Sequence, residues 1–356
     1  MAITREVLDA ADRVRRSLAQ INTNHLVELA GAWAGAWDSI AEDFEEAIGE
    51  LVNQGAGRLT RTQVSRNRRI QATLEQVAEV LSVLYEESAD LVAGDLLYVV
   101  RSAVEGQQLV LQGQLPPAPA TGPAVGLQLN APSPDALNAI VARSTETIHS
   151  LSRPLPAVVV EKMKQELVRG IALGKNPEAV GRRILRNVEG EFNGGLTRAV
   201  TIARTEILDA HRQATRELAK SNTDILAGWL WSCTLDVKTC PSCLSKHGTL
   251  HPVGEFGPID HQNGRCARID KVKTWKELGL PGEEPEDDFP NSQEWFRGLN
   301  ESAQREIMGP TRLQLLKDGK IAWSDLSQRR NSPGWRDSQV VTPVRDLLDK
   351  SKEATP

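Results

Sequence analysis

Apolar side chains recur every three or four positions over much of the first third of the chain. Two runs show this spacing: Leu26, Leu29, Ala30, Trp33 and Trp37, and then Val77, Val80, Leu81 and Leu84. A period near 3.6 residues places such side chains on one face of a helix. The pattern predicts an extended helical N-terminal part, in which the two tryptophans pack between helices and do not form a ligand cage.

Helical patterns continue beyond residue 150. We predict a helix near 156–173, a new helix start at Asn176-Pro177-Glu178, and a longer helix near 196–221 with a continuous apolar stripe. Asparagine caps helices well and proline suits their first turn.

After the helical segment near 196–221, the spacing of apolar residues changes to an alternating one. Trp229, Trp231 and Cys233 alternate as on one face of a strand, and a short returning strand is expected near 267–272. The predicted fold is therefore mainly α with a small zinc-stabilised β-hairpin element (α+β), where the metal follows from the cysteine pattern described below.

Proline, alanine and glycine dominate residues 113–134. Because prolines lack the amide donor and hold the backbone extended, neither a helix nor a strand should continue through this stretch. It divides the chain into predicted parts: a helical N-terminal domain (1–112), the linker (113–134), a second domain (135–328) and a polar tail (329–356).

Composition describes an ordinary water-soluble chain of 356 residues with a net charge of −5, so no overall positive field attracts nucleic acid. Four cysteines are too few for a disulfide framework, and metal-binding thiols fit a reducing compartment. The chain begins without an apolar signal core and holds no run of about 18 apolar residues. We expect the protein to be made and kept in a cytoplasm, or packaged directly from one, and we expect no membrane association.

Arginines gather in the acid-free stretch 51–74, namely Arg58, Arg61, Arg66, Arg68 and Arg69. Such a group can contact DNA or an acidic partner surface. The alternative is a solvated helix face beside the acidic residues at 42–50, and we favour that alternative.

Three of the four cysteines lie in one short window, together with histidines. Cys240 and Cys243 are spaced to hold one metal ion from a tight turn, and His261 with Cys266 can complete the site. Zinc takes about four such nitrogen and sulfur ligands in a tetrahedron. Four protein ligands leave no open position for water, so we predict structural Zn²⁺. His247 and His251 are weaker alternatives for the histidine ligand, and Cys233 is expected to be a buried core thiol.

These motifs resemble the phage head morphogenesis, or minor head protein, family related to the Mu F protein. The resemblance covers roughly residues 155–326. It rests on an Ala203-Arg204-Thr205-Glu206 helix followed by Trp231, Asp236, Thr239-Cys240-Pro241-Ser242-Cys243, Gly248, Pro258, His261 and Arg265-Cys266. One departure is Gly264, which stands where the family often has a cysteine.

The resemblance implies a structural, non-enzymatic protein of the virion, at or near the portal vertex inside the phage head. Its implied partners are the portal protein, the major capsid protein, or both, and packaged double-stranded DNA. Arg204 and Glu206 flank the apolar stripe of their helix. We predict that these two residues, with Thr205 and Asp236, form a structural network that braces the helix against the zinc-bearing hairpin.

Two other functions compete with this interpretation. Asp260-His261-Gln262-Asn263 faintly resembles a nuclease element, although a zinc-bound histidine cannot also act as a general base. A nucleic-acid-binding zinc module is suggested by nearby cations: Lys238, Lys246, Arg265, Arg268, Lys271 and Lys273. A nucleic-acid deaminase is excluded because its H-x-E element is missing.

Overall fold

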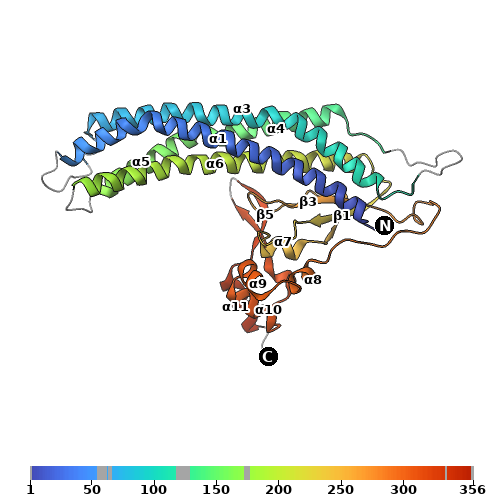
Figure 1. Cartoon of the computed structure of the whole chain (residues 1–356). Helices are drawn as coiled ribbons and strands as arrows, with labels where there is room; N and C mark the ends of the chain where they lie inside the picture. The colour runs from blue at the N-terminus through green and yellow to red at the C-terminus, as the bar shows by residue number, and fades with distance from the viewer. Residues whose placement is uncertain are drawn as a thin grey trace. The chain divides into compact units, whose positions relative to one another are not determined.

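The computed structural model describes residues 2–53, 62, 66–117, 129–171, 177–332 and 335–353. Most of them are helical, which confirms the predicted fold class (Figure 1). The long helices are α1 (Arg5–Asn53), α3 (Arg68–Gln112), α4 (Pro134–Ser152), α5 (Leu155–Ile171) and α6 (Pro177–Lys220).

The chain forms two compact units, and the division between them falls within helices. The helical unit consists of Ala19–Leu97 and Val141–Ile207. The mixed unit consists of Met1–Leu18, Tyr98–Ile140 and Leu208–Pro356. Both ends of the chain therefore belong to one unit, whereas the proline-rich composition places a boundary at residues 113–134.

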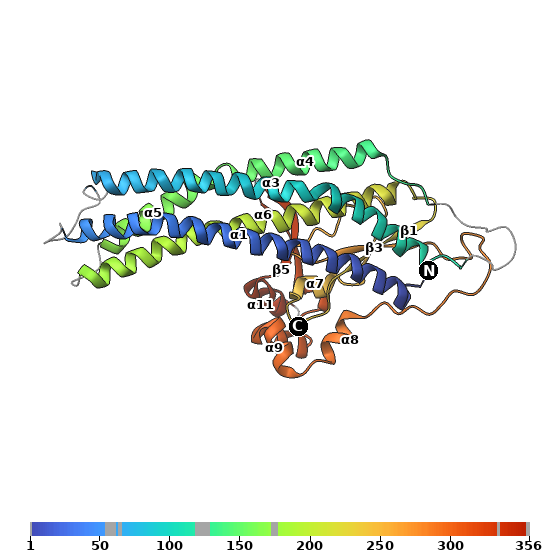
Figure 2. The ribbon, with the colours of Figure 1, turned by 45° about the horizontal axis from the view of Figure 1, so that its top comes forward.

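The core of the helical unit lies between helices that run side by side in Figures 1 and 2. Trp33 is 1% exposed and meets the edge of Tyr85, with ring centroids 5.4 Å apart. Trp37 packs on Phe192 at 5.3 Å. Both tryptophans are thus packing residues, as predicted, whereas Leu26 is 39% exposed and lies outside the core.

Helix α6 continues through Gly194 and Gly195, and it merges the two helical segments expected near 177 and 196–221. A side chain at Gly195 would meet the Tyr85 hydroxyl, because an added Cβ would lie 2.8 Å from that oxygen. The hydroxyl instead donates a hydrogen bond to the Gly195 carbonyl at 3.0 Å. The glycine therefore lets the buried tyrosine approach the helix backbone.

The mixed unit contains an antiparallel sheet with strand order β2-β1-β3, formed by β1 (Leu226–Ser232), β2 (Leu250–His251) and β3 (Ala267–Val272). The returning strand is as predicted, while β2 is an addition to the expected hairpin. Trp229 and Trp231 enter one apolar cluster and Leu230 enters another. Because both faces of β1 are covered, its burial does not alternate.

The start of α1 helps to cover this sheet. Ile3, Val7 and Ala10 share an apolar cluster with Val110 of α3 and with Leu230 and Ile269 of the sheet. The first residues of the chain therefore contribute to the same core as strands more than 200 positions later in sequence.

Apart from strands β2 and β3, the described chain after β1 is built from further short elements. They are α7 (Pro241–Lys246) beside the sheet, then α8 (Ser292–Arg297), α9 (Glu301–Met308), α10 (Pro310–Lys317), the 3-10 helix η1 (Trp323–Leu326), β4 (Ser327–Ser332), β5 (Trp335–Val341) and α11 (Val344–Glu353). Polar composition predicts a tail over 329–356, but the structure has a hairpin and a helix there. Leu347 of α11 is 1% exposed and anchors this segment in a core.

The predicted linker is fixed at both ends. Its middle, 118–128, lies outside the described residues. Gln114 is fully buried, and Asn130 exchanges hydrogen bonds with Asn222 at 2.8 and 2.9 Å. Gln114, Asn130 and Asn222 all belong to the mixed unit.

Candidate metal centre

The first half of the site is a tight turn that leads into α7. Cys240 is the N-cap of this helix, Pro241 follows in the first turn, and the Cys243 amide donates to the Cys240 sulfur at 3.4 Å. A sulfur in the capping position satisfies an amide that the helix cannot pair. The same turn aims Cys240 and Cys243 at one point.

The second half comes from the loop between β2 and β3. Ligand atoms of Cys240, Cys243 and His261 all lie within 4.8 Å of one another. A tetrahedral zinc ion with sulfur at about 2.3 Å would separate its ligand atoms by about 3.8 Å. These three residues therefore fit a metal ion with small adjustments. Cys266, the predicted fourth ligand, is not part of this group of three. It is 3% exposed and belongs to the same apolar cluster as Cys243, so its role as a ligand stays a prediction.

The ligand residues strongly perturb one another's pKa values. A hydrogen bond from Cys243, followed by the effect of His261, lowers the pKa of Cys240 to about 4. The hydrogen bond to Cys240 raises the pKa of His261 to about 9. Hydrogen bonds to Cys240 and then Cys266 raise the pKa of Cys243. Groups this close share protons, and a metal ion would replace those protons.

Of the three histidines in this region, His261 is the one suited to a metal. Its Nδ1 lies 2.8 Å from the Gln262 carbonyl, which leaves Nε2 as the ring nitrogen available to a metal ion in place of the Cys240 hydrogen bond. His247 uses both ring nitrogens, at 3.0 Å from the Cys233 amide and 3.0 Å from the Pro290 carbonyl. His251 likewise contacts Thr249 and Glu255. The geometry thus favours the predicted histidine over its two alternatives.

Cys233 is a core thiol, as predicted. It is 3% exposed, and its sulfur lies 3.5 Å from His247 Nδ1. Burial is the largest cause that raises its pKa. The residue therefore stays protonated and is no metal ligand in this arrangement.

Two residues whose structural role the sequence did not reveal hold the loop on α6. Arg212 of α6 and Asp260 form a buried ion pair with both nitrogen–oxygen distances at 2.8 Å. Asp260 precedes His261 directly, which is the one sequence signal for it. Arg212 lies in a polar tripeptide, His211-Arg212-Gln213, that resembles any solvated helix segment.

Asp236, predicted to be structural, holds the arginine next to Cys266. Its two carboxylate oxygens accept hydrogen bonds from Arg265 at 2.6 and 2.7 Å, and it also accepts one from Thr239 at 2.9 Å. The bonds from Arg265, and then from Thr239, lower the pKa of Asp236 against the opposing effect of burial. The ion pair between Asp236 and Arg265 joins the segment before Cys240 to the segment before Cys266.

The other residues of the predicted network lie in the helical unit. Thr205 donates to the Thr201 carbonyl at 2.6 Å, Glu206 is 3% exposed, and Arg204 is half-buried. The metal site lies in the mixed unit, so their bracing of the zinc-bearing element stays a prediction.

Several cations proposed for nucleic-acid contact are engaged within the protein. Arg268 is buried in an ion pair with Asp270 at 2.5 Å, and Arg265 is held by Asp236. Arg69 pairs with Glu46 and Glu50, as the solvated-helix alternative predicts. Arg66 and Arg68 are exposed. Arg58 and Arg61 lie outside the described residues.

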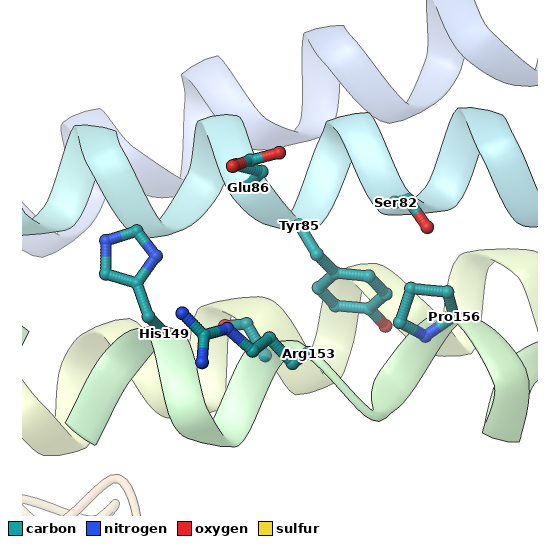
Figure 3. Close-up of a pocket in the computed structure, with 7 residues that line it drawn as sticks. Ser82, Tyr85, Glu86, His149, Arg153 and Pro156 are labelled. Carbon is teal, nitrogen blue, oxygen red and sulfur yellow. The ribbon is translucent and has the colours of Figure 1, made fainter. Parts of the chain in front are cut away.

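The helical unit has a pocket of about 290 Å³ between α3 and the α4–α5 turn (Figure 3). Glu86 and Ser82 line it from α3, while His149 and Arg153 face them from the other side. His149 also lies 3.5 Å from Asp90. Acidic and basic groups oppose each other here, so the pocket has no single charge that would select a ligand.

Among the described residues, no helix has both the length and the apolar character needed to cross a bilayer.

Comparisons with curated proteins and with solved structures gave no match. Residues 161–269 match the family described as Phage Mu protein F like protein. The match begins within α5, ends within β3 and includes all four predicted metal ligands. The resemblance read from the motifs is therefore confirmed over residues 161–269, while its expected extension to about residue 326 lies outside the match, and residues 161–269 form a Phage Mu protein F like region, consistent with a phage head morphogenesis protein.

Proposed function

We propose that this protein is a structural minor head protein of a tailed phage, located at or near the portal vertex, with no enzymatic activity. The observation that carries the proposal is the family match over residues 161–269. Its partners are the portal protein, the major capsid protein, or both. The protein is made in the host cytoplasm and then enters the head.

The metal centre supports a structural role. Cys240, Cys243 and His261 surround one point, and Cys266 packs beside Cys243. Zn²⁺ suits this set of three sulfurs and one imidazole. With Cys266 as the proposed fourth ligand, no position would remain for the water that catalytic zinc activates. The ion would act as a cross-link between α7 and the loop before β3.

Contact with packaged DNA is the secondary part of the proposal, and a DNA-binding module or a nuclease is its rival. The engaged state of Arg265 and Arg268 disfavours a phosphate surface at the metal centre. Exposed Arg66 and Arg68 in the helical unit are the better candidates for an acidic partner.

Fractionation of purified virions tests the proposal. Intact particles, and particles emptied by DNA ejection, should both be probed for this protein and for the portal protein. We expect the protein in intact particles in few copies, and co-purification with portal complexes after gentle disruption. Its restriction to the infected-cell lysate, with none in particles, would contradict a head role.

A parallel assay addresses the rival functions. Zinc-loaded protein should be incubated with plasmid DNA and Mg²⁺ or Mn²⁺, with the His261→Ala variant as control. We expect no cleavage by either protein. Cleavage that disappears in the variant would instead establish a nuclease, and salt-dependent DNA binding lost on Arg265→Ala would establish a binding module.

A further inference from the structure

Arg212 is a buried cation in the part of α6 that belongs to the mixed unit. Its side chain is 9% exposed, and that of its partner Asp260 is 2% exposed. The guanidinium meets both carboxylate oxygens at 2.8 Å. Such a two-bond pair has a defined orientation as well as a favourable charge interaction. The pair therefore fixes where the loop carrying Asp260 sits on α6.

The same two side chains hold the backbone of Cys266 from both sides. The Cys266 amide donates to Asp260 Oδ2 at 3.1 Å, and the Cys266 carbonyl accepts from Arg212 Nη2 at 2.8 Å. Asp260 is also the neighbour of His261. Arg212 thus sets the positions of both residues in the second half of the metal site, although it contacts neither of their ligand atoms.

Gly264 provides independent support for this arrangement. A Cβ added at this position would lie 2.0 Å from Asp260 Oδ2 and 2.2 Å from Asp260 Cγ. Any side chain here would displace the carboxylate from Arg212. The Asp260 contact in this chain therefore requires a glycine at position 264.

We infer that Arg212 is a positioning residue of the metal centre. Through Asp260 and the Cys266 backbone it holds His261 and Cys266 at the separation that closes on Cys240 and Cys243. Metal binding and the docking of residues 260–266 on α6 then stabilise each other. This inference rests on the proposed metal-binding role of the cysteine cluster.

Removing the contacts of Arg212 with Asp260 and with the Cys266 carbonyl should weaken metal binding while leaving all four proposed ligands in place. Outer-shell partners of metal ligands contribute about 10- to 100-fold to affinity. Arg212→Lys keeps the charge but cannot bind Asp260 and the Cys266 carbonyl together, since a lysine lacks the planar fork. Asp260→Asn and Gly264→Ala disturb the same contact from the other side.

The chain offers matched controls for these variants. Arg216 lies one turn further along α6, is bound to the Gly254 carbonyl at 3.0 Å, and is remote from Cys266 in its contacts. An added Cβ at Gly254 meets nothing within 4 Å. Arg216→Lys and Gly254→Ala should therefore retain wild-type metal affinity.

The experiment measures Zn²⁺ affinity of the full chain by competition with a colorimetric chelator, together with the visible spectrum of the Co²⁺-loaded protein. We expect about a 10- to 100-fold loss of affinity in Arg212→Lys and Gly264→Ala, and a changed cobalt spectrum. Wild-type affinity and spectrum in both variants would overturn the inference. Equal losses in the two controls would also overturn it, because they would indicate general destabilisation.

If Arg212→Lys does not fold, Asp260→Asn and Gly264→Ala provide the same comparison. A wild-type protein that binds neither Zn²⁺ nor Co²⁺ would refute the metal centre itself, and the inference with it. That result differs from unchanged affinity in the variants, which leaves the centre intact and removes only the role of Arg212.

Discussion

The side-chain oxygen of Gln114 accepts a hydrogen bond from the backbone amide of Val272 at 3.0 Å, and its nitrogen donates to the Asp270 carbonyl at 2.8 Å. Strand β3 is at the edge of its sheet, so these backbone groups have no strand partner on that side. Gln114 is fully buried and takes the place of a fourth strand at this point. The end of α3 is thereby joined to the sheet.

Replacing Gln114 with leucine should destabilise the mixed unit. The change keeps the size of the side chain but leaves a buried amide and a buried carbonyl without partners, at a cost of about 1–3 kcal/mol each. Urea unfolding should show this loss. Gln112→Leu, at an exposed position two residues earlier, is the control and should change stability little. A wild-type midpoint for Gln114→Leu would contradict the assignment.

Cutting the chain within 113–134 should not separate the two halves. A specific protease site placed in this stretch would divide the mixed unit between two fragments. The first fragment would hold Met1–Leu18 and the chain from Tyr98 to the cut, and the second would hold Leu208–Pro356. These segments belong to one compact unit, so the cut protein should elute as a single species on size-exclusion chromatography. Two independently folded fragments that elute apart would support the linker-and-domain organisation expected from composition.

Zinc should bind with one ion per chain, and Cys243→Ser or Cys266→Ser should reduce or abolish it. Structural zinc contributes about 10–16 kcal/mol in small peptide sites, which is comparable with the stability of a whole domain. Loss of the ion should therefore unfold residues near 229–272, measured by hydrogen exchange and elemental analysis. The helical unit, with its own core, should keep its protection. Cys233→Ala is the matched control and should retain the ion.

His247 should make folding stability depend on pH. Burial, offset in part by the bond to Pro290, lowers the pKa of His247 to about 4, whereas the unfolded value is about 6.5. Between these values the unfolded chain binds the additional proton, so stability falls as pH decreases from about 6.5 to about 4. The expected contribution is about 3 kcal/mol. His247→Gln should lie below wild type at pH 7, and the two curves should converge toward pH 4. Parallel curves would show that His247 does not cause the dependence.

Local patterns were sufficient for much of the fold. The three-to-four spacing around Trp33 and Trp37 identified helix faces, because the period of a helix is a property of neighbouring residues. The spacing of Cys240 and Cys243 identified a turn that could hold a metal ion, for the same reason. The alternation at Trp229 and Trp231 located β1, although its burial on both faces depends on what packs around it.

The sequence by itself determined the helices, the position of β1 and β3, and the residues able to bind a metal. Only the tertiary structure decided that Arg212 lies beneath Asp260, that Gln114 completes the edge of β3, and that both chain ends share one unit. Arg212 and Asp260 are 48 positions apart, and Gln114 lies 156 and 158 positions from Asp270 and Val272. None of these residues carries a local sequence signature of its partner. A polar residue is recognised as structural only when burial and its partner are known, because the same side chain in water costs nothing to leave unpaired.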